Sequence, residues 1–118
     1  MKTKLSMAMA ILFVQLAMGQ EMDPNKMADY QNTIMIEQLD LTDSQKEQVR
    51  AINLKYSKKQ AALLNKEGSM FSKMGDMKKI KKAKNEELEE VLSKEQMEIF
   101  ENEIEPEMRK QMKRQRGS

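Results

Sequence analysis

Few residues in this chain could do metal or acid–base chemistry. The 118-residue sequence contains no His and no Cys, and those side chains supply the imidazole and thiolate ligands that zinc sites typically use. Its carboxylates stand in solvated runs rather than in pairs inside apolar segments, and no glycine-rich phosphate loop is present. The sequence therefore predicts a protein that is not an enzyme and has no cofactor.

Three methionines form a weak candidate metal site. Met70, Met74 and Met77 recur at helical spacing, and their thioether sulfurs suit Cu(I), which favours soft ligands. Methionine more often fills irregular gaps in a core or covers an adaptable surface. The pattern favours packing over copper binding and leaves Cu(I) as an open alternative.

A binding surface is the better interpretation of the same region. Nine methionines follow residue 19, and these unbranched, polarizable side chains suit a surface that meets partners of many shapes. Neighbouring lysines would attract acidic or amphipathic segments by charge. The candidate contact residues are Met74, Met77, Lys78, Lys79, Ile80 and Lys82. The alternative is a solvated lysine face over an ordinary core.

The helix that carries these residues is expected to run from about Asp76 to Leu92. Gly68 and Gly75 bracket the segment before it, which we expect to be a flexible turn with room for one helical turn inside. Lys84 falls within the apolar stripe of the helix. The charges of this predicted helix oppose the helix macrodipole, because glutamates occupy the C-terminal end of the helix. Five lysines occupy its N-terminal half: Lys78, Lys79, Lys81, Lys82 and Lys84.

Three further helices are expected. One runs from about Pro24 to Leu39, since Asp23 can cap it and proline suits the first helical position. A long helix of about 24 residues begins at Asp43 and reaches Gly68 without a breaker. The last carries a regular apolar stripe interrupted by Pro106, so it is either bent near Asn102 or split in two.

Two helices begin with nearly the same five residues. Leu41-Thr42-Asp43-Ser44-Gln45 returns as Leu92-Ser93-Lys94-Glu95-Gln96. The hydroxyl of Thr42 or Ser93 can accept a hydrogen bond from the first helical turn, while Gln45 or Gln96 reaches back to the N–H of the cap residue. Each segment is therefore predicted to form a capping box.

This pair of motifs resembles the Spy/CpxP family of periplasmic proteins, which is known for two Leu-Thr-x-x-Gln (LTXXQ) motifs. Leu41, Thr42 and Gln45 match in full, whereas the second motif has Ser93 in place of Thr. The resemblance implies a curved all-helical cradle, commonly a homodimer, that binds unfolded or stressed proteins without ATP. Some members of the family are described as metal-responsive, but this chain lacks the imidazole and thiolate ligands typical of such sites.

The first 19 residues have the pattern of a secretory signal peptide. Lys2 and Lys4 precede an apolar run too short for a comfortable membrane span, and Ala17 and Gly19 suit cleavage at Gly19/Gln20. No Cys follows that could accept a lipoprotein anchor. We therefore expect a periplasmic protein that is not stably inserted in the membrane.

The predicted mature chain is electrically balanced. Removing Lys2 and Lys4 from 21 basic residues leaves 19, equal to the 19 acidic residues. This balance gives no support to a nucleic-acid partner. Without disulfides, and with only four aromatic residues after residue 19, a thick core is not expected.

The sequence thus predicts one all-α domain over residues 20–118, with about four helices in an open, curved, antiparallel layer, a dimeric state and a basic, frayed tail at 109–118. We expect an ATP-independent chaperone or stress-response adaptor. The alternatives are a module that docks on the periplasmic domain of a membrane sensor kinase and, third, a metal-responsive protein. The sequence does not separate the first two.

Overall fold

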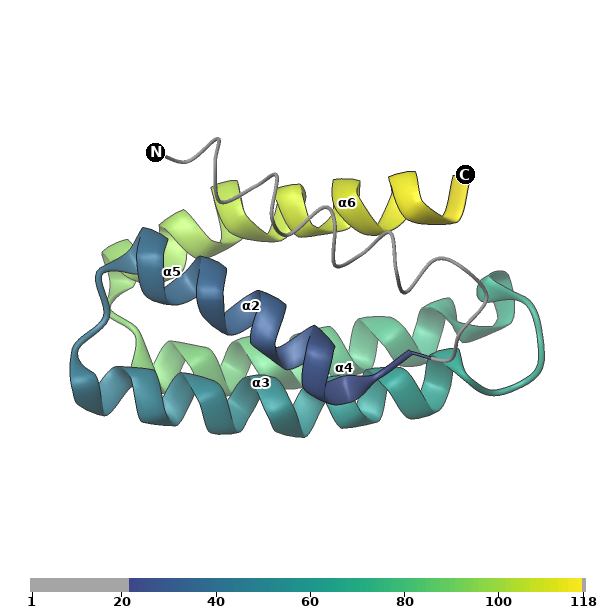
Figure 1. Ribbon diagram of the computed structural model, residues 1–118, viewed down its shortest axis with the longest axis horizontal. Coiled ribbons are helices and arrows are strands. Elements are labelled where there is room, and N and C mark those ends of the chain that lie inside the picture. The colour runs from purple at the N-terminus through teal and green to yellow at the C-terminus, as the bar shows by residue number, and fades with distance from the viewer. Residues whose placement is uncertain (1–21, 118) are drawn as a thin grey trace.

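The computed structural model describes residues 22–117, with side chains placed through residue 111, and this part of the chain is all-helical. The elements are α2 (Pro24–Leu39), α3 (Asp43–Leu64), α4 (Met70–Val91), α5 (Lys94–Ile99), the π-helical turn η1 (Phe100–Ile104) and α6 (Glu105–Gly117). The predicted all-α fold with four helices packed antiparallel is confirmed, with α5, η1 and α6 together forming the fourth (Figure 1). The predicted signal peptide, residues 1–19, lies outside the described residues.

Helices α3 and α4 form a long antiparallel hairpin, and α2 packs along α3 (Figure 1). The chain then turns through α5 and η1, and α6 runs above α2 in this view. Side chains from four elements meet in the core, where Met35, Val49, Leu88 and Phe100 have no exposed surface. No helix among the described residues is long and apolar enough to cross a membrane.

Helix α4 begins at Met70, six residues before the predicted start at Asp76. Ser69 caps it by accepting a hydrogen bond from the Ser72 N–H at 3.2 Å. Gly75, taken as a breaker in the sequence, lies inside the helix, where glycine costs only about 0.5–1 kcal/mol relative to alanine. The segment between Gly68 and Gly75 therefore contains a helical turn, but the predicted flexible turn is wrong from Met70 onward, because this part continues into α4 without a break.

Lys73 holds the connection between α3 and α4. Its side chain is buried, and its ammonium donates to the carbonyl oxygens of Leu64, at 3.2 Å, and Lys66. A cation at these carbonyls also complements the negative end of the α3 dipole. The chain turns at Gly68, whose φ of 118° favours a residue without a Cβ.

The earlier start of α4 removes most of the predicted conflict between its lysines and the macrodipole. Lys78 is the ninth residue of the helix, and the four lysines at positions 79 to 84 lie farther along. The effect of the dipole falls off within the first turn. The lysines therefore need no explanation of this kind.

The π-helical turn accommodates Pro106. In a continuous α-helix the ring of Pro106 would clash with the carbonyl group of Asn102, and its missing N–H would leave that carbonyl unpaired. Instead the helix widens over Phe100–Ile104, and the Glu105 N–H donates to the Phe100 carbonyl oxygen five residues earlier. The predicted interruption near Asn102 is therefore a local π turn between α5 and α6.

Candidate functional site

The two paired motifs form the predicted capping boxes. Thr42 Oγ1 accepts from the Gln45 N–H at 3.1 Å, and Gln45 Oε1 accepts from the Thr42 N–H at 3.0 Å. The Ser93–Gln96 pair repeats both bonds, at 3.1 and 2.9 Å. Leu41 and Leu92, which precede the caps, are both buried in the core.

The two glutamines also bind each other, which capping does not require. Gln45 Nε2 donates to Gln96 Oε1 at 2.8 Å, and Gln96 Nε2 donates back to Gln45 Oε1 at 3.3 Å. Gln45 Nε2 also donates to the Val91 carbonyl oxygen and Gln96 Nε2 to that of Leu39, both at 3.0 Å. These bonds tie the α2–α3 junction to the α4–α5 junction, so the glutamines join parts of the chain that are distant in sequence.

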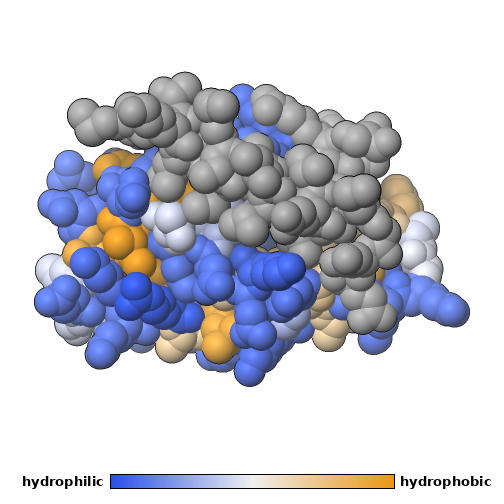
Figure 2. Space-filling view, viewed as in Figure 1, coloured by the Kyte–Doolittle hydropathy of each residue, from blue (hydrophilic) through white to orange (hydrophobic). Residues whose placement is uncertain are grey.

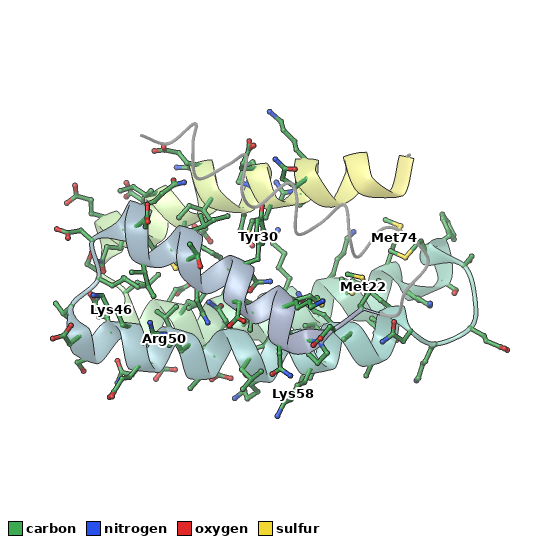
Figure 3. All side chains as sticks on the ribbon, viewed as in Figure 1. Met22, Tyr30, Lys46, Arg50, Lys58 and Met74 are labelled. Atoms are coloured by element: carbon green, nitrogen blue, oxygen red, sulfur yellow. The ribbon has the colours of Figure 1, made fainter. Side chains whose placement is uncertain are left out.

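A cavity of about 470 Å³ opens between α2, α4 and α6, with the last turns of α3 beside it. In Figure 3, Tyr30 projects from α2 toward α6. The apolar part of the lining consists of Met27, Tyr30, Leu64, Met77 and Met108. The volume lies within the range of about 300–1,000 Å³ usual for pockets that hold small molecules.

The charged lining of this cavity is mostly basic. Lys78, Lys81 and Lys84 come from α4 and Arg109 from α6, whereas Glu105 is the one carboxylate that the described residues contribute to the lining. Lys81 Nζ lies 3.9 Å from Glu105 Oε2. Among the described lining residues, basic side chains therefore outnumber carboxylates by four to one.

Lys84 is the buried member of this basic group. It is 5% exposed, its Nζ donates to Gln31 Oε1 at 2.6 Å, and it lies 5.9 Å from the centre of the Phe100 ring. Burial lowers the pKa of Lys84 to about 8, although the negative charge of Glu105 acts in the opposite direction. Among the described residues, the Gln31 amide oxygen and the Phe100 ring therefore lie against the buried ammonium, with the charge of Glu105 nearby.

A second feature lies on the outer surface of α4. Among the described residues, Phe71 and Met74 are the large hydrophobic side chains that are exposed, at 85% and 48%. Met74 lies near the α3–α4 connection (Figure 3). Outside the atoms drawn in grey, the face shown in Figure 2 is mostly hydrophilic, with small and separate hydrophobic areas.

Phe71 and Met74 continue into exposed lysines on the same side of the helix. Lys78 and Lys82 follow at intervals of four residues, which places all four side chains in one row. We call Phe71, Met74, Lys78 and Lys82 the outer stripe of α4. Its apolar end lies at the tip of the hairpin and its basic end nearer the middle of the helix.

The six predicted contact residues fall in different surroundings. Met77 and Lys78 line the cavity, whereas Met74, Lys79 and Lys82 are exposed and do not line it. Ile80 packs against the core. The structure therefore does not bring the six together into one surface, and the partly buried Ile80 has a packing role besides its predicted role as a contact residue.

The three methionines of the Cu(I) alternative also differ in how far their side chains are exposed. Met74 is exposed, Met70 is half-buried, and Met77 is half-buried in the cavity lining. No group of three or more His, Cys, Asp or Glu side chains that could hold a metal ion occurs within the described part of the chain.

Sequence reasoning missed most of the cavity. Tyr30 and Gln31 from α2 and Met108 from α6 were not identified as candidate residues, because their convergence depends on how the helices cross. One sequence signal was available, namely a lysine within the apolar stripe of its helix, and that residue is Lys84. Phe71 was missed because its segment was taken as a turn.

These features define an all-helical protein with a basic and apolar cavity beside a helical hairpin. Residues 15–100 match the family described as "Domain of unknown function (DUF4890)", and the chain belongs to this family. No curated protein and no solved structure matches the chain significantly.

Proposed function

We propose that this protein is an ATP-independent periplasmic chaperone or stress-response adaptor that captures unfolded or stressed polypeptides. The observation that carries the proposal is the outer stripe of α4, where exposed Phe71 and Met74 adjoin exposed lysines. Large apolar side chains without a packing role favour contact with apolar segments of a partner.

The chemistry of the stripe suits weak binding of many partners. Met74 is flexible and polarizable, and Phe71 offers a flat apolar face that is not held in the core. Lys78 and Lys82 would attract acidic segments over a range of about 10 Å at moderate ionic strength. The stripe therefore combines attraction by charge with holding by apolar contact.

The paired capping motifs add support of a different kind. They resemble the two motifs of the Spy/CpxP family, which implies periplasmic capture of unfolded proteins and commonly a homodimer. In this chain the motif side chains are occupied in structural bonds. The proposal therefore assigns client contact to the outer stripe and fold maintenance to the motifs.

The test is suppression of aggregation by the purified mature protein, without nucleotide, for two clients of unrelated sequence. Changing Phe71 and Met74 to Ser should weaken protection of both clients, and neither change removes a core contact, since both side chains are exposed. The matched control changes Ala51 and Ala62 to Ser, at exposed positions on α3. It should protect as the unmodified protein does.

A second set of experiments separates the attraction of clients by charge from their retention by apolar contacts. Changing Lys78, Lys79 and Lys82 to Glu, or raising the salt concentration from about 0.05 to 0.5 M, should slow association with acidic clients because screening shortens the reach of exposed charges. Light scattering of the protein alone, across a concentration series, would test the homodimer.

The main alternative is a regulatory module that docks on the periplasmic domain of a sensor kinase. Failure to protect either client, together with recovery of one sensor-kinase domain from periplasmic extract, would reject the chaperone proposal in favour of this module. The third function, a metal response, would instead require tight and stoichiometric metal binding.

A further inference from the structure

We propose that the cavity between α2, α4 and α6 binds a single-chain amphiphile with an anionic head group, such as a free fatty acid. The cavity adjoins the outer stripe of α4, since Lys78 belongs to both, but Phe71 and Met74, the apolar end of the stripe, do not line it. Changing Phe71 and Met74 to Ser tests the proposed capture of polypeptides and leaves the cavity lining unchanged, so the two proposals can fail separately.

The charge of the lining selects an anion. Among the described residues, four basic side chains line the cavity against one carboxylate, Glu105, which lies near Lys81. Lys84 is the basic group most shielded from water, and its ammonium has donor capacity beyond the hydrogen bond to Gln31. A carboxylate or phosphate next to Lys84 would gain a charge-assisted hydrogen bond of the stronger kind.

The rest of the lining selects an apolar chain. Met27, Leu64, Met77 and Met108 offer flexible or aliphatic walls, and Tyr30 adds an aromatic ring. Such walls give an inorganic anion nothing beyond its charge, whereas an acyl chain displaces water from them. Methionine side chains also adapt to chains of different length.

The basic groups differ in burial, which suggests how the ligand lies. Lys78 and Arg109 are exposed, whereas Lys84 is buried. A head group that enters as far as Lys84 leaves its chain along the methionines, while one that stops at Arg109 sends its chain inward. The two arrangements share one ligand chemistry and differ in which basic residue matters most.

Displacement of a fluorescent dansyl-labelled undecanoate from the purified mature protein tests the proposal. The competitors are decanoate, dodecanoate and tetradecanoate, each below its micelle concentration. Each added methylene should tighten binding roughly fourfold until the cavity is filled. Dodecanol and dodecyltrimethylammonium, with the same chain and a neutral or cationic head, should compete at least tenfold more weakly than dodecanoate.

Two variants identify the head-group contact, and a third serves as the control. Lys84→Met keeps an unbranched stem without the charge, and Arg109→Gln removes the charge at the cavity mouth. At least one of the two should weaken dodecanoate binding about tenfold or more. Lys79→Met changes an exposed lysine on the same helix that does not line the cavity, and it should bind within twofold of the unmodified protein.

Further arms distinguish the source of the head group. Dodecyl phosphate competing as well as dodecanoate would support recognition of anionic head groups in general. Vesicles of phosphatidylglycerol should compete poorly, because their chains stay in the bilayer. Circular dichroism establishes whether each variant is folded. If Lys84→Met does not fold, Arg109→Gln still tests the head-group contact.

Several results would overturn the proposal. These are absence of saturable probe binding, equal competition by dodecyltrimethylammonium, affinity that does not depend on chain length, or an equal loss in Lys79→Met. Vesicles that compete where free dodecanoate does not would likewise reject a cavity ligand and indicate binding to a membrane surface.

Discussion

The buried position of Lys84 predicts an unusual dependence of stability on pH. Its pKa is about 8 in the folded protein, compared with an ordinary value of 10.5. Below pH 8 the amine is protonated in both states, so folding carries the full cost of burying the charge. Above pH 10.5 it is neutral in both states and that cost is absent. Between these limits the unfolded state binds more protons, so the free energy of unfolding rises with pH.

The size of the effect follows from the same two values. Each pH unit between about 8 and 10.5 corresponds to about 1.36 kcal/mol, so the whole interval is worth about 3 kcal/mol. The facing groups are Gln31, which accepts from Lys84, and Glu105, whose charge favours the protonated amine. Tyr30 acts in the opposite direction above pH 10, because burial and then Glu107 raise its pKa to about 12. The clean window therefore lies from about pH 8 to 9.5.

Urea unfolding at a series of pH values measures this slope. The unmodified protein should gain stability across the window, whereas Lys84→Met should be flat. The control Lys79→Met, at an exposed position of α4, should keep the slope of the unmodified protein.

The slope is a better measure than stability at one pH. At pH 7, Lys84→Met has two opposing effects on the free energy of unfolding. Removing the buried charge raises it, but leaving the Gln31 oxygen without its donor lowers it by about 1–3 kcal/mol. Changing Gln31 to Leu together with Lys84→Met removes both partners, and this double variant should be more stable than either single variant. An unchanged slope in Lys84→Met would refute the reasoning, because Lys84 would then not be buried as a charged group below pH 8.

Four further predictions concern the motifs, export and metal. Changing Thr42 or Ser93 to Ala should lower the free energy of unfolding by about 0.5–2 kcal/mol each without loss of helix content, and thermal melts showing no change in either would contradict the capping role. Gln96→Glu can still accept from the Ser93 N–H but cannot donate to the Leu39 carbonyl oxygen, so it should cost about 1–3 kcal/mol at neutral pH; a loss no larger than experimental error would show that capping alone matters. Intact-mass measurement of fractionated protein should find a periplasmic chain that begins at Gln20, and retention of residues 1–19 would argue against export with cleavage. Zinc should bind only weakly and should leave the melting temperature unchanged. A tight stoichiometric zinc site found by calorimetry would contradict this prediction.

The sequence by itself determined the helical class and most helix starts. Asp23-Pro24 and the two hydroxyl caps act through bonds within one turn, so neighbouring residues suffice to predict them. The prediction failed at Gly75, where a local breaker signal did not end or begin a helix. Ser69 offered a cap six residues earlier, and Lys73 stabilised the connection by bonding to carbonyl groups at the end of α3.

Only the tertiary structure decided which side chains meet. Gln45 and Gln96 looked like two independent caps, yet their amides pair because the two junctions lie side by side. The cavity likewise joins Tyr30, Lys84 and Met108 from three helices, and no periodicity within one helix specifies how another crosses it. Lys84 marks the boundary between the two kinds of information. Its place in an apolar stripe was visible in the sequence, but its burial, its bond to Gln31 and its lowered pKa depend on side chains that other helices bring next to it.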